Sequence, residues 1–320
     1  MIIYACHGAA KQVTGSCHLI ICNRRRILID CGLFQGGREI EQANAEPFEF
    51  DPASIDALLL THAHLDHCGR IPLLVKRGFR GRIYTTAATR ELARVVLLDS
   101  AGLQEEDARR AAVRKRNGNG RNGNSRNGDT PEGPLYTIDD ALHALDYFAA
   151  DVSYGDPVQI TDGIRARFLD AGHILGSASI LLDLDDGHVQ RRMLFSGDLG
   201  NSGRPIVRDP MPAATADYVV MESTYGDRPH RSVPDSVEEL YQAIRETYAR
   251  RGNVIIPTFA LERTQEILYY LHQGIRNGLL PTNLRVFLDS PMAISATEIF
   301  RRHPECFDLD FIAELEHGDP

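Results

Sequence analysis

Short apolar runs alternate with longer amphipathic stretches over the first two hundred residues of this 320-residue chain. Runs rich in β-branched and aromatic residues predict strands, and apolar residues at helical spacing predict helices. The expected strands are residues 19–22, 26–30, 55–61, 81–85, 163–170, 177–184 and 192–196. The expected helices are residues 71–77, 89–116 and 138–148. This order favours a mixed α/β sandwich over an all-α or all-β fold.

The pattern changes after about residue 205, where strands and helices alternate singly. Expected strands at 217–222, 253–259 and 284–289 are each followed by an expected helix, at 236–251, 262–273 and 292–303. Three consecutive β-α units predict a parallel sheet with functional groups at the carboxyl ends of its strands. We therefore expect two domains, at residues 1–207 and 208–320.

Residues 116–133, RNGNGRNGNSRNGDTPEG, contain no apolar side chain and several Asn-Gly pairs. Such a segment cannot bury enough surface to offset its ordering entropy, which predicts a disordered loop. Its arginines could contact an anionic polymer, but a solvated tether between two helices is the favoured interpretation.

The segment THAHLDH directly follows the apolar run IDALLLT. His62 and His64 can point the same way if the backbone stays extended, and Asp66 and His67 then lie at the turn into the next helix. A single ion could not use all four side chains with good geometry. The crowding therefore predicts two metal ions in one pocket, as in binuclear hydrolases.

Further metal-binding side chains occur where other expected strands end. His173 lies in FLDAGHILGS, Asp198 in MLFSGDLG and Asp30 in ILIDCG. Each alone is typical of an ordinary turn residue, but the combined set has little other physical use. A carboxylate such as Asp198 can bridge two cations, while Asp30 is suited to orienting ligands. Seven other histidines are interpreted as structural or surface residues: His18, His143, His188, His230, His272, His303 and His317.

The composition of the chain bears on which partners and structural cross-links it can have. A formal net charge of −9 argues against a broadly basic nucleic-acid-binding surface, although bound divalent ions would add local positive charge. The six cysteines form no C-x-x-C pair, which argues against a disulfide framework or a structural zinc knot. No apolar run is long enough to span a bilayer and no signal peptide is recognisable, so we expect a cytoplasmic protein with no membrane partner.

Together, THAHLDH, Asp30, His173 and Asp198 resemble the metallo-β-lactamase superfamily. Three later segments resemble the β-CASP domain of RNA-processing nucleases such as ribonuclease J and the cleavage and polyadenylation nuclease: YVVMESTYGDR (218–228), IPTFALERTQEILYYL (256–271) and VFLDSPMAISATEIF (286–300). The resemblance implies an αββα sandwich with a binuclear site, followed by part of a parallel-sheet β-CASP domain. The β-CASP segments distinguish RNA-processing nucleases from other hydrolases of the superfamily, because the histidine motif alone fits both.

Carried over residue by residue, the resemblance implies two ions that share Asp198. It assigns one ion to His62, His64 and His173, and the other to Asp66 and His67. It also implies catalytic roles for Asp66, Asp30 and Glu222, of which Glu222 matches the acidic motif at the start of β-CASP. Candidate substrate contacts come from GAAKQVTGSCH and from the β-CASP segments: Thr14, Gly15, Ser16, Arg263 and Ser290.

The chain departs from this pattern after Ser290. The resemblance implies two further histidines and a return of the chain to complete the sandwich, and neither His303 nor His317 has the expected setting. We therefore expect the 320 residues to be part of a longer protein, with a sandwich that is incomplete at its C-terminal end. The second ion should then bind more weakly and the activity should be lower.

The expected function is metal-dependent hydrolysis of RNA phosphodiester bonds by a hydroxide held between the ions. Mixed nitrogen and oxygen ligands favour zinc, with manganese as the competitor. Three alternatives stay open: a DNA-directed nuclease of the same subgroup, a thioester or lactone hydrolase of the same superfamily, and a non-catalytic RNA-binding subunit. The sequence leaves open whether the protein forms a homodimer.

Overall fold

The computed structural model describes residues 1–117, 133–148, 151–212, 215–229 and 231–316. The loop expected at 116–133 and the residue His317 lie almost entirely outside these ranges. Within the described residues, no helix combines the length and the apolar character that crossing a membrane requires.

The first sheet has the strand order β1-β2-β3-β4-β5. Its strands are β1 (Ile2–Cys6), β2 (His18–Cys22), β3 (Arg25–Ile29), β4 (Ala57–Leu59) and β5 (Arg82–Tyr84). The first three strands pair antiparallel, whereas β3, β4 and β5 are parallel. The carboxyl ends of β3 and β4 therefore lie side by side, which brings Asp30 beside the segment that follows β4.

The second sheet has the strand order β10-β9-β8-β7-β6. Its strands are β6 (Pro157–Thr161), β7 (Ile164–Asp170), β8 (Ala178–Asp185), β9 (Gln190–Phe195) and β10 (Tyr218–Val220). Pairing is antiparallel except between β9 and β10. The sequence pattern missed β1 and β6, both at sheet edges and only partly buried.

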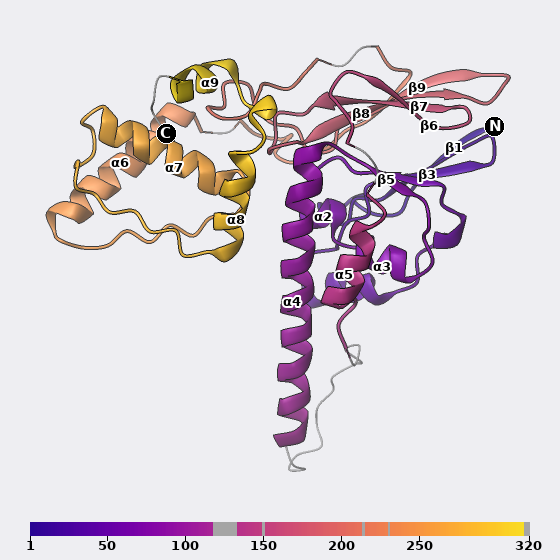
Figure 1. Ribbon diagram of the computed structural model, residues 1–320, viewed down its shortest axis with the longest axis horizontal. Coiled ribbons are helices and arrows are strands. Elements are labelled where there is room, and N and C mark those ends of the chain that lie inside the picture. The colour runs from indigo at the N-terminus through magenta and orange to yellow at the C-terminus, as the bar shows by residue number, and fades with distance from the viewer. Residues whose placement is uncertain (118–132, 149–150, 213–214, 230, 317–320) are drawn as a thin grey trace.

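The two sheets pack face to face around one apolar core (Figure 1). Alternate residues of β2 and β3, such as Ile20 and Ile27, face the second sheet, where they meet Phe168 and Ile180. The intervening residues, such as Leu28, face a second core shared with the helices. This period-two alternation is what a sheet covered on both faces requires.

Five helices accompany the first sheet, and the last four cover its outer face (Figure 1). They are α1 (Arg38–Gln42), α2 (Leu65–Cys68), α3 (Ile71–Lys76), α4 (Ala87–Asn117) and α5 (Ile138–Leu145). Single 3-10 turns form at Ala43–Ala45, Pro52–Ser54 and Pro304–Cys306. The α4 helix has 31 residues, and its second half extends beyond the body of the domain.

The C-terminal part contains four helices: α6 (Val233–Ala249), α7 (Arg263–Arg276), α8 (Pro291–Phe300) and α9 (Leu309–Glu316). The helices α6 and α7 share a small apolar cluster that includes Tyr241, Ile244 and Leu271. The helix α8 packs against α4, which joins this part to the first domain. The expected division at residues 207 and 208 stays a prediction.

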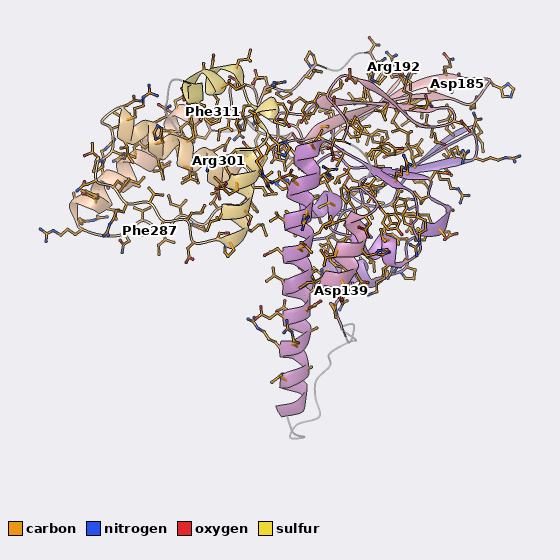
Figure 2. All side chains as sticks on the ribbon, viewed as in Figure 1. Asp139, Asp185, Arg192, Phe287, Arg301 and Phe311 are labelled. Carbon is orange, nitrogen blue, oxygen red and sulfur yellow. The ribbon has the colours of Figure 1, made fainter. Side chains whose placement is uncertain are left out.

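The expected three-strand parallel sheet does not form in the described residues of the C-terminal part. The strand expected at 217–222 is β10, and it pairs with β9 in the second sheet. Residues 253–259 and 284–289 form no ladder with any described strand. Ile255, Phe259 and Phe287 are 80–89% exposed, and Figure 2 places Phe287 far from both sheets. An apolar run predicts a strand only where a neighbouring strand can accept its backbone hydrogen bonds.

Candidate metal centre

The centre begins where β4 ends. Leu60 still donates its backbone N–H to Tyr84 of β5, so the chain stays extended as far as Thr61. The four-residue helix α2 then starts at Leu65, directly after His64. This extended segment followed by a single turn brings the three histidines and the aspartate of THAHLDH to one edge of the first sheet.

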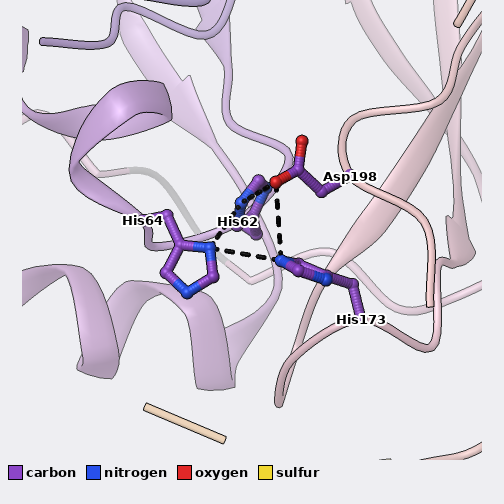
Figure 3. Close-up of side chains that lie close together, drawn as sticks. All are labelled: His62, His64, His173 and Asp198. Atoms are coloured by element: carbon purple, nitrogen blue, oxygen red, sulfur yellow. Dashed lines mark hydrogen bonds and ion pairs between the residues drawn. The ribbon is translucent and has the colours of Figure 1, made fainter. Parts of the chain in front are cut away.

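Four ligand atoms converge from the two sheets, namely His62 Nε2, His64 Nδ1, His173 Nε2 and Asp198 Oδ2 (Figure 3). The nitrogen of His64 lies 3.1 Å from that of His62 and 3.2 Å from that of His173. Asp198 Oδ2 lies 3.6 Å from His62 and 3.5 Å from His173. A tetrahedral ion with ligands at about 2.0–2.1 Å has ligand edges of about 3.3–3.4 Å.

The protonation states of these side chains suit a cation. Burial lowers the pKa of His62 well below its ordinary value, that of His64 to about 4 and that of His173 to about 3. Burial alone would raise the pKa of Asp198, but the hydrogen bond from His67 lowers it to about 2. Three neutral imidazoles and one carboxylate therefore face one point at neutral pH.

A second group lies on the other side of Asp198. His67 Nε2 is 3.2 Å from Asp198 Oδ1 and 3.9 Å from Asp66 Oδ2. Burial opposes protonation of His67, but the charges of Asp30 and Asp198 outweigh it and raise its pKa well above the ordinary value. Burial raises the pKa of Asp66. The two oxygens of Asp198 thus face two separate sets of side chains.

Asp30 stabilises this arrangement by hydrogen bonds with Thr61 and His67. Its side chain is buried, and its backbone is left-handed, with φ 60°. Its Oδ1 accepts hydrogen bonds from the backbone N–H and the hydroxyl of Thr61, at 2.8 and 3.0 Å. Its Oδ2 lies 2.7 Å from His67 Nδ1 and accepts from Ser16 Oγ at 3.2 Å. Such a carboxylate fixes the tautomer and the orientation of the imidazole.

A cavity of about 360 Å³ opens beside the second group. Ser16, His67, Asp198 and Glu222 are among its lining residues. Glu222 follows β10 and accepts a hydrogen bond from the N–H of Leu199, the neighbour of Asp198, at 2.6 Å. Glu222 therefore lies where it can hold the Asp198 loop.

The remaining predicted contacts lie elsewhere. The hydroxyl of Thr14 hydrogen-bonds the backbone of Gln35, and Gly15 has φ 83° and no room for a Cβ beside Phe34. Arg263 forms an ion pair with Glu266, and the hydroxyl of Ser290 accepts from Ala293 N to cap α8. None of these four lines the cavity, and their proposed contact with substrate stays a prediction.

Comparison with known proteins agrees with this fold. A family model described as metallo-beta-lactamase superfamily matches residues 10–258. The chain belongs to the metallo-β-lactamase superfamily. A model of the Beta-Casp domain matches residues 264–317 of this superfamily member.

Curated relatives of this metallo-β-lactamase superfamily member include proteins named as nucleases. Ribonuclease TTHA0252 of Thermus thermophilus is 38% identical, over 97% of this chain and 63% of the relative. The RNase J-like protein of Methanocaldococcus jannaschii is 31% identical, over 94% of this chain and 61% of the relative. Transcription termination factor FttA of Methanosarcina mazei is 31% identical, over 95% of this chain and 44% of the relative. The chain therefore spans less than two thirds of each relative.

A solved structure supports the fold alone. An Enterococcus faecalis protein of unknown function matches with a TM-score of 0.52 and 15% identity, covering 93% of this chain and 67% of that chain.

The family implies divalent metal ions, and the side chains fit them. The donor set of three imidazole nitrogens and one carboxylate oxygen is typical of zinc-type sites. The nitrogen separations of 3.1–3.2 Å are also close to the ligand edges of a tetrahedral ion.

One residue of the cavity escaped the sequence analysis. His18, interpreted as structural, lines the cavity; its Nδ1 lies 3.1 Å from the hydroxyl of Tyr4 and its Nε2 3.4 Å from Ser16 Oγ. Burial lowers its pKa. Its position two residues after Ser16, at the end of the glycine-containing loop, was the available signal.

Proposed function

We propose that this chain carries the active site of a ribonuclease that hydrolyses RNA phosphodiester bonds with two divalent metal ions. The observation that carries the proposal is the position of Asp198 between two sets of ligands. Its Oδ2 faces His62 and His173, while its Oδ1 faces His67. A carboxylate shared in this way is the usual bridge of binuclear hydrolases.

The first position consists of His62, His64, His173 and Asp198, and the second of Asp66, His67 and Asp198. Zinc is the favoured ion because imidazole and carboxylate ligands at tetrahedral edges suit it, and manganese is the competitor. When bound, such ions activate water and neutralise charge on phosphate oxygens. The second position offers fewer ligands among the described residues, which supports weaker binding there.

The side chains of this protein have distinct parts in that chemistry. Asp30 orients His67, and Glu222 holds the loop that carries Asp198. We assign to Asp66 the acceptance of the proton of the attacking water, because its carboxylate lies beside His67 in the second group. The cavity beside the second position gives a phosphodiester access to His67, Asp198 and Glu222, which are among its lining residues.

RNA is the preferred substrate because two of the relatives are named ribonuclease or RNase J-like. A DNA-directed nuclease would use the same centre and is the second candidate. A hydrolase of small thioesters or lactones has no evident need for the segment that matches the Beta-Casp domain.

The direct test is hydrolysis of matched oligonucleotides. The protein is stripped of metal with a chelator and then supplied with zinc or manganese, and cleavage of an RNA is compared with cleavage of the DNA of the same sequence. The proposal expects cleavage of RNA that disappears with chelator and returns with the ion. Equal cleavage of DNA would favour the second candidate, and cleavage of a lactone or thioester without cleavage of RNA would overturn the proposal.

A further inference from the structure

Two of the proposed ligands come from loops of the second sheet that lie far apart in sequence. His173 follows β7, and Asp198 follows β9. Neither side chain sits on a helix or a strand. Their positions relative to the first sheet therefore depend on what holds the two loops.

The Asp198 loop is attached to α7 by a buried ion pair. Arg204, six residues after Asp198, donates from a terminal guanidinium nitrogen to Glu266 Oε1 in the first turn of α7. The Glu266 side chain is 3% exposed and that of Arg204 is 23% exposed. A buried carboxylate that loses such a partner is strongly unfavourable, so the pair fixes the distance between the loop and the helix.

The His173 loop contacts the same end of α7. Ile174 and Leu175 share an apolar cluster with Leu261 and with Ile206, which follows Arg204. Glu262, the residue before α7, is buried beside the backbone N–H of Leu175, although neither of its oxygens makes a regular hydrogen bond.

Glu262 also has an unusual backbone for its residue type. Its φ is 63°, in the left-handed region that disfavours side chains with a Cβ. Such strain persists only where the surroundings impose it. Together with its burial, this places the start of α7 firmly against the loop that follows β7.

We propose that the Arg204–Glu266 ion pair is a positioning element for the metal centre: it ties the Asp198 loop to α7, whose start also packs against the His173 loop, and so sets the affinity of the first position. This inference rests on the proposed function. It extends the proposed function, because the C-terminal part of the chain becomes a determinant of metal binding at a site where none of the described residues of that part belongs to the ligand cluster.

A matched pair of variants tests the inference, because Glu266 binds two arginines. Arg204 reaches its Oε1 and belongs to the Asp198 loop, whereas Arg263 reaches its Oε2 at 2.8 Å and belongs to α7 itself. Arg204→Gln and Arg263→Gln each remove one guanidinium from the same carboxylate. Only the first detaches the loop.

The measurement is zinc affinity by competition with a chromogenic chelator, using zinc alone as the probe. Positioning predicts that Arg204→Gln weakens zinc binding by about tenfold to a hundredfold, while Arg263→Gln stays within about twofold of the wild type. Simple electrostatics predicts that Arg204→Gln binds zinc more tightly, because removal of a nearby positive charge strengthens cation binding. The nearby charge of Arg204 already contributes to the lowered pKa of His173.

Arg204→Lys provides the conservative rescue, since it keeps a cation for Glu266, and it should recover part of the lost affinity. Unchanged or tighter zinc binding by Arg204→Gln overturns the positioning role and leaves the proposed function intact. Equal losses in Arg204→Gln and Arg263→Gln also overturn it, since they indicate general destabilisation. A wild-type protein that binds no zinc and no manganese overturns both proposals.

Discussion

The two sides of the candidate metal centre are built in different ways. The first sheet supplies His62, His64, Asp66 and His67 from one continuous segment, held by β4, α2 and the single carboxylate of Asp30. The second sheet supplies His173 and Asp198 from two separate loops that pack or pair with the start of α7. Local chain geometry positions the first set, whereas tertiary contacts from the C-terminal part position the second.

The largest effect is expected from removing a ligand on the first-sheet side. His64→Ala deletes the nitrogen that lies 3.1–3.2 Å from both other histidine nitrogens, so the tetrahedral set is lost. Zinc content should fall by about one ion per chain, and RNA cleavage should fall by about a hundredfold or more. Elemental analysis and cleavage rates measure the two effects.

The matched control for this variant is His188→Ala, which alters an exposed histidine in the turn between β8 and β9. It should leave metal content and cleavage unchanged. Loss of an ion in both variants would mean that the effect does not come from the centre.

A smaller effect on metal binding is expected from changing Asp30, which contacts the ligand His67. Asparagine tolerates the left-handed backbone of residue 30, so Asp30→Asn preserves the fold. Its amide nitrogen would face His67 Nδ1, which then carries no proton, and the remaining proton on Nε2 blocks the second position. Affinity of the second ion should fall by about tenfold to a hundredfold, with the first ion retained. Calorimetric titration with zinc resolves the two ions, and an equal loss of both would contradict this division.

The effect of Glu262 on the second-sheet side is visible only in the pH dependence of unfolding. Burial, followed by the charge of Glu266, raises its pKa to about 8, while Arg204 and Arg263 oppose the rise. The folded state therefore binds a proton that the unfolded state releases above its ordinary pKa of 4.5. The free energy of unfolding should fall as pH rises from about 4.5 to about 8, by up to about 5 kcal/mol at about 1.4 kcal/mol per pKa unit.

The test compares Glu262→Gln with the wild type by urea unfolding of the metal-free protein at about pH 5 and about pH 9. The variant should lose this part of the pH dependence and gain relative stability at the higher pH. An identical pH dependence in both proteins would show that Glu262 titrates normally, and so is not buried against the His173 loop.

The smallest effect is expected from changing Ser290, which directly precedes α8 and is not among the proposed ligands. The hydroxyl of Ser290 caps α8, and α8 contacts α7 through the hydrogen bond between Thr297 and Gln265. Ser290→Ala should cost about 1 kcal/mol of unfolding free energy. The KM for RNA should stay the same, and an increased KM with unchanged stability would instead support the substrate contact that the sequence suggested.

The same contrast explains what could be predicted from the sequence. THAHLDH is a local pattern, and His173 and Asp198 were found because each follows a recognisable strand. The supporting contacts of Arg204, Glu262 and Glu266 join segments about sixty to ninety residues apart, and no local pattern marks such pairs. His18 is a different case, because it was interpreted as structural although it lies two residues after Ser16, at the end of the glycine-containing loop.

The strands expected at 253–259 and 284–289 were predicted from the sequence but do not form in the structure. Their apolar runs satisfy the strand pattern, but the hydrogen-bonding partners that a strand needs are not present among the described residues. By contrast, β10 is only three residues long and is a true strand because β9 lies beside it. Neighbours in space, which the pattern does not contain, decide between these cases.

The central claim is that side chains from both sheets hold one ion, and anomalous diffraction from zinc-soaked crystals at the zinc absorption edge tests it most directly. The account predicts a peak within about 2.0–2.1 Å of His62 Nε2, His64 Nδ1, His173 Nε2 and Asp198 Oδ2. A peak that lies elsewhere, or one bound only by residues of the first sheet, would contradict it.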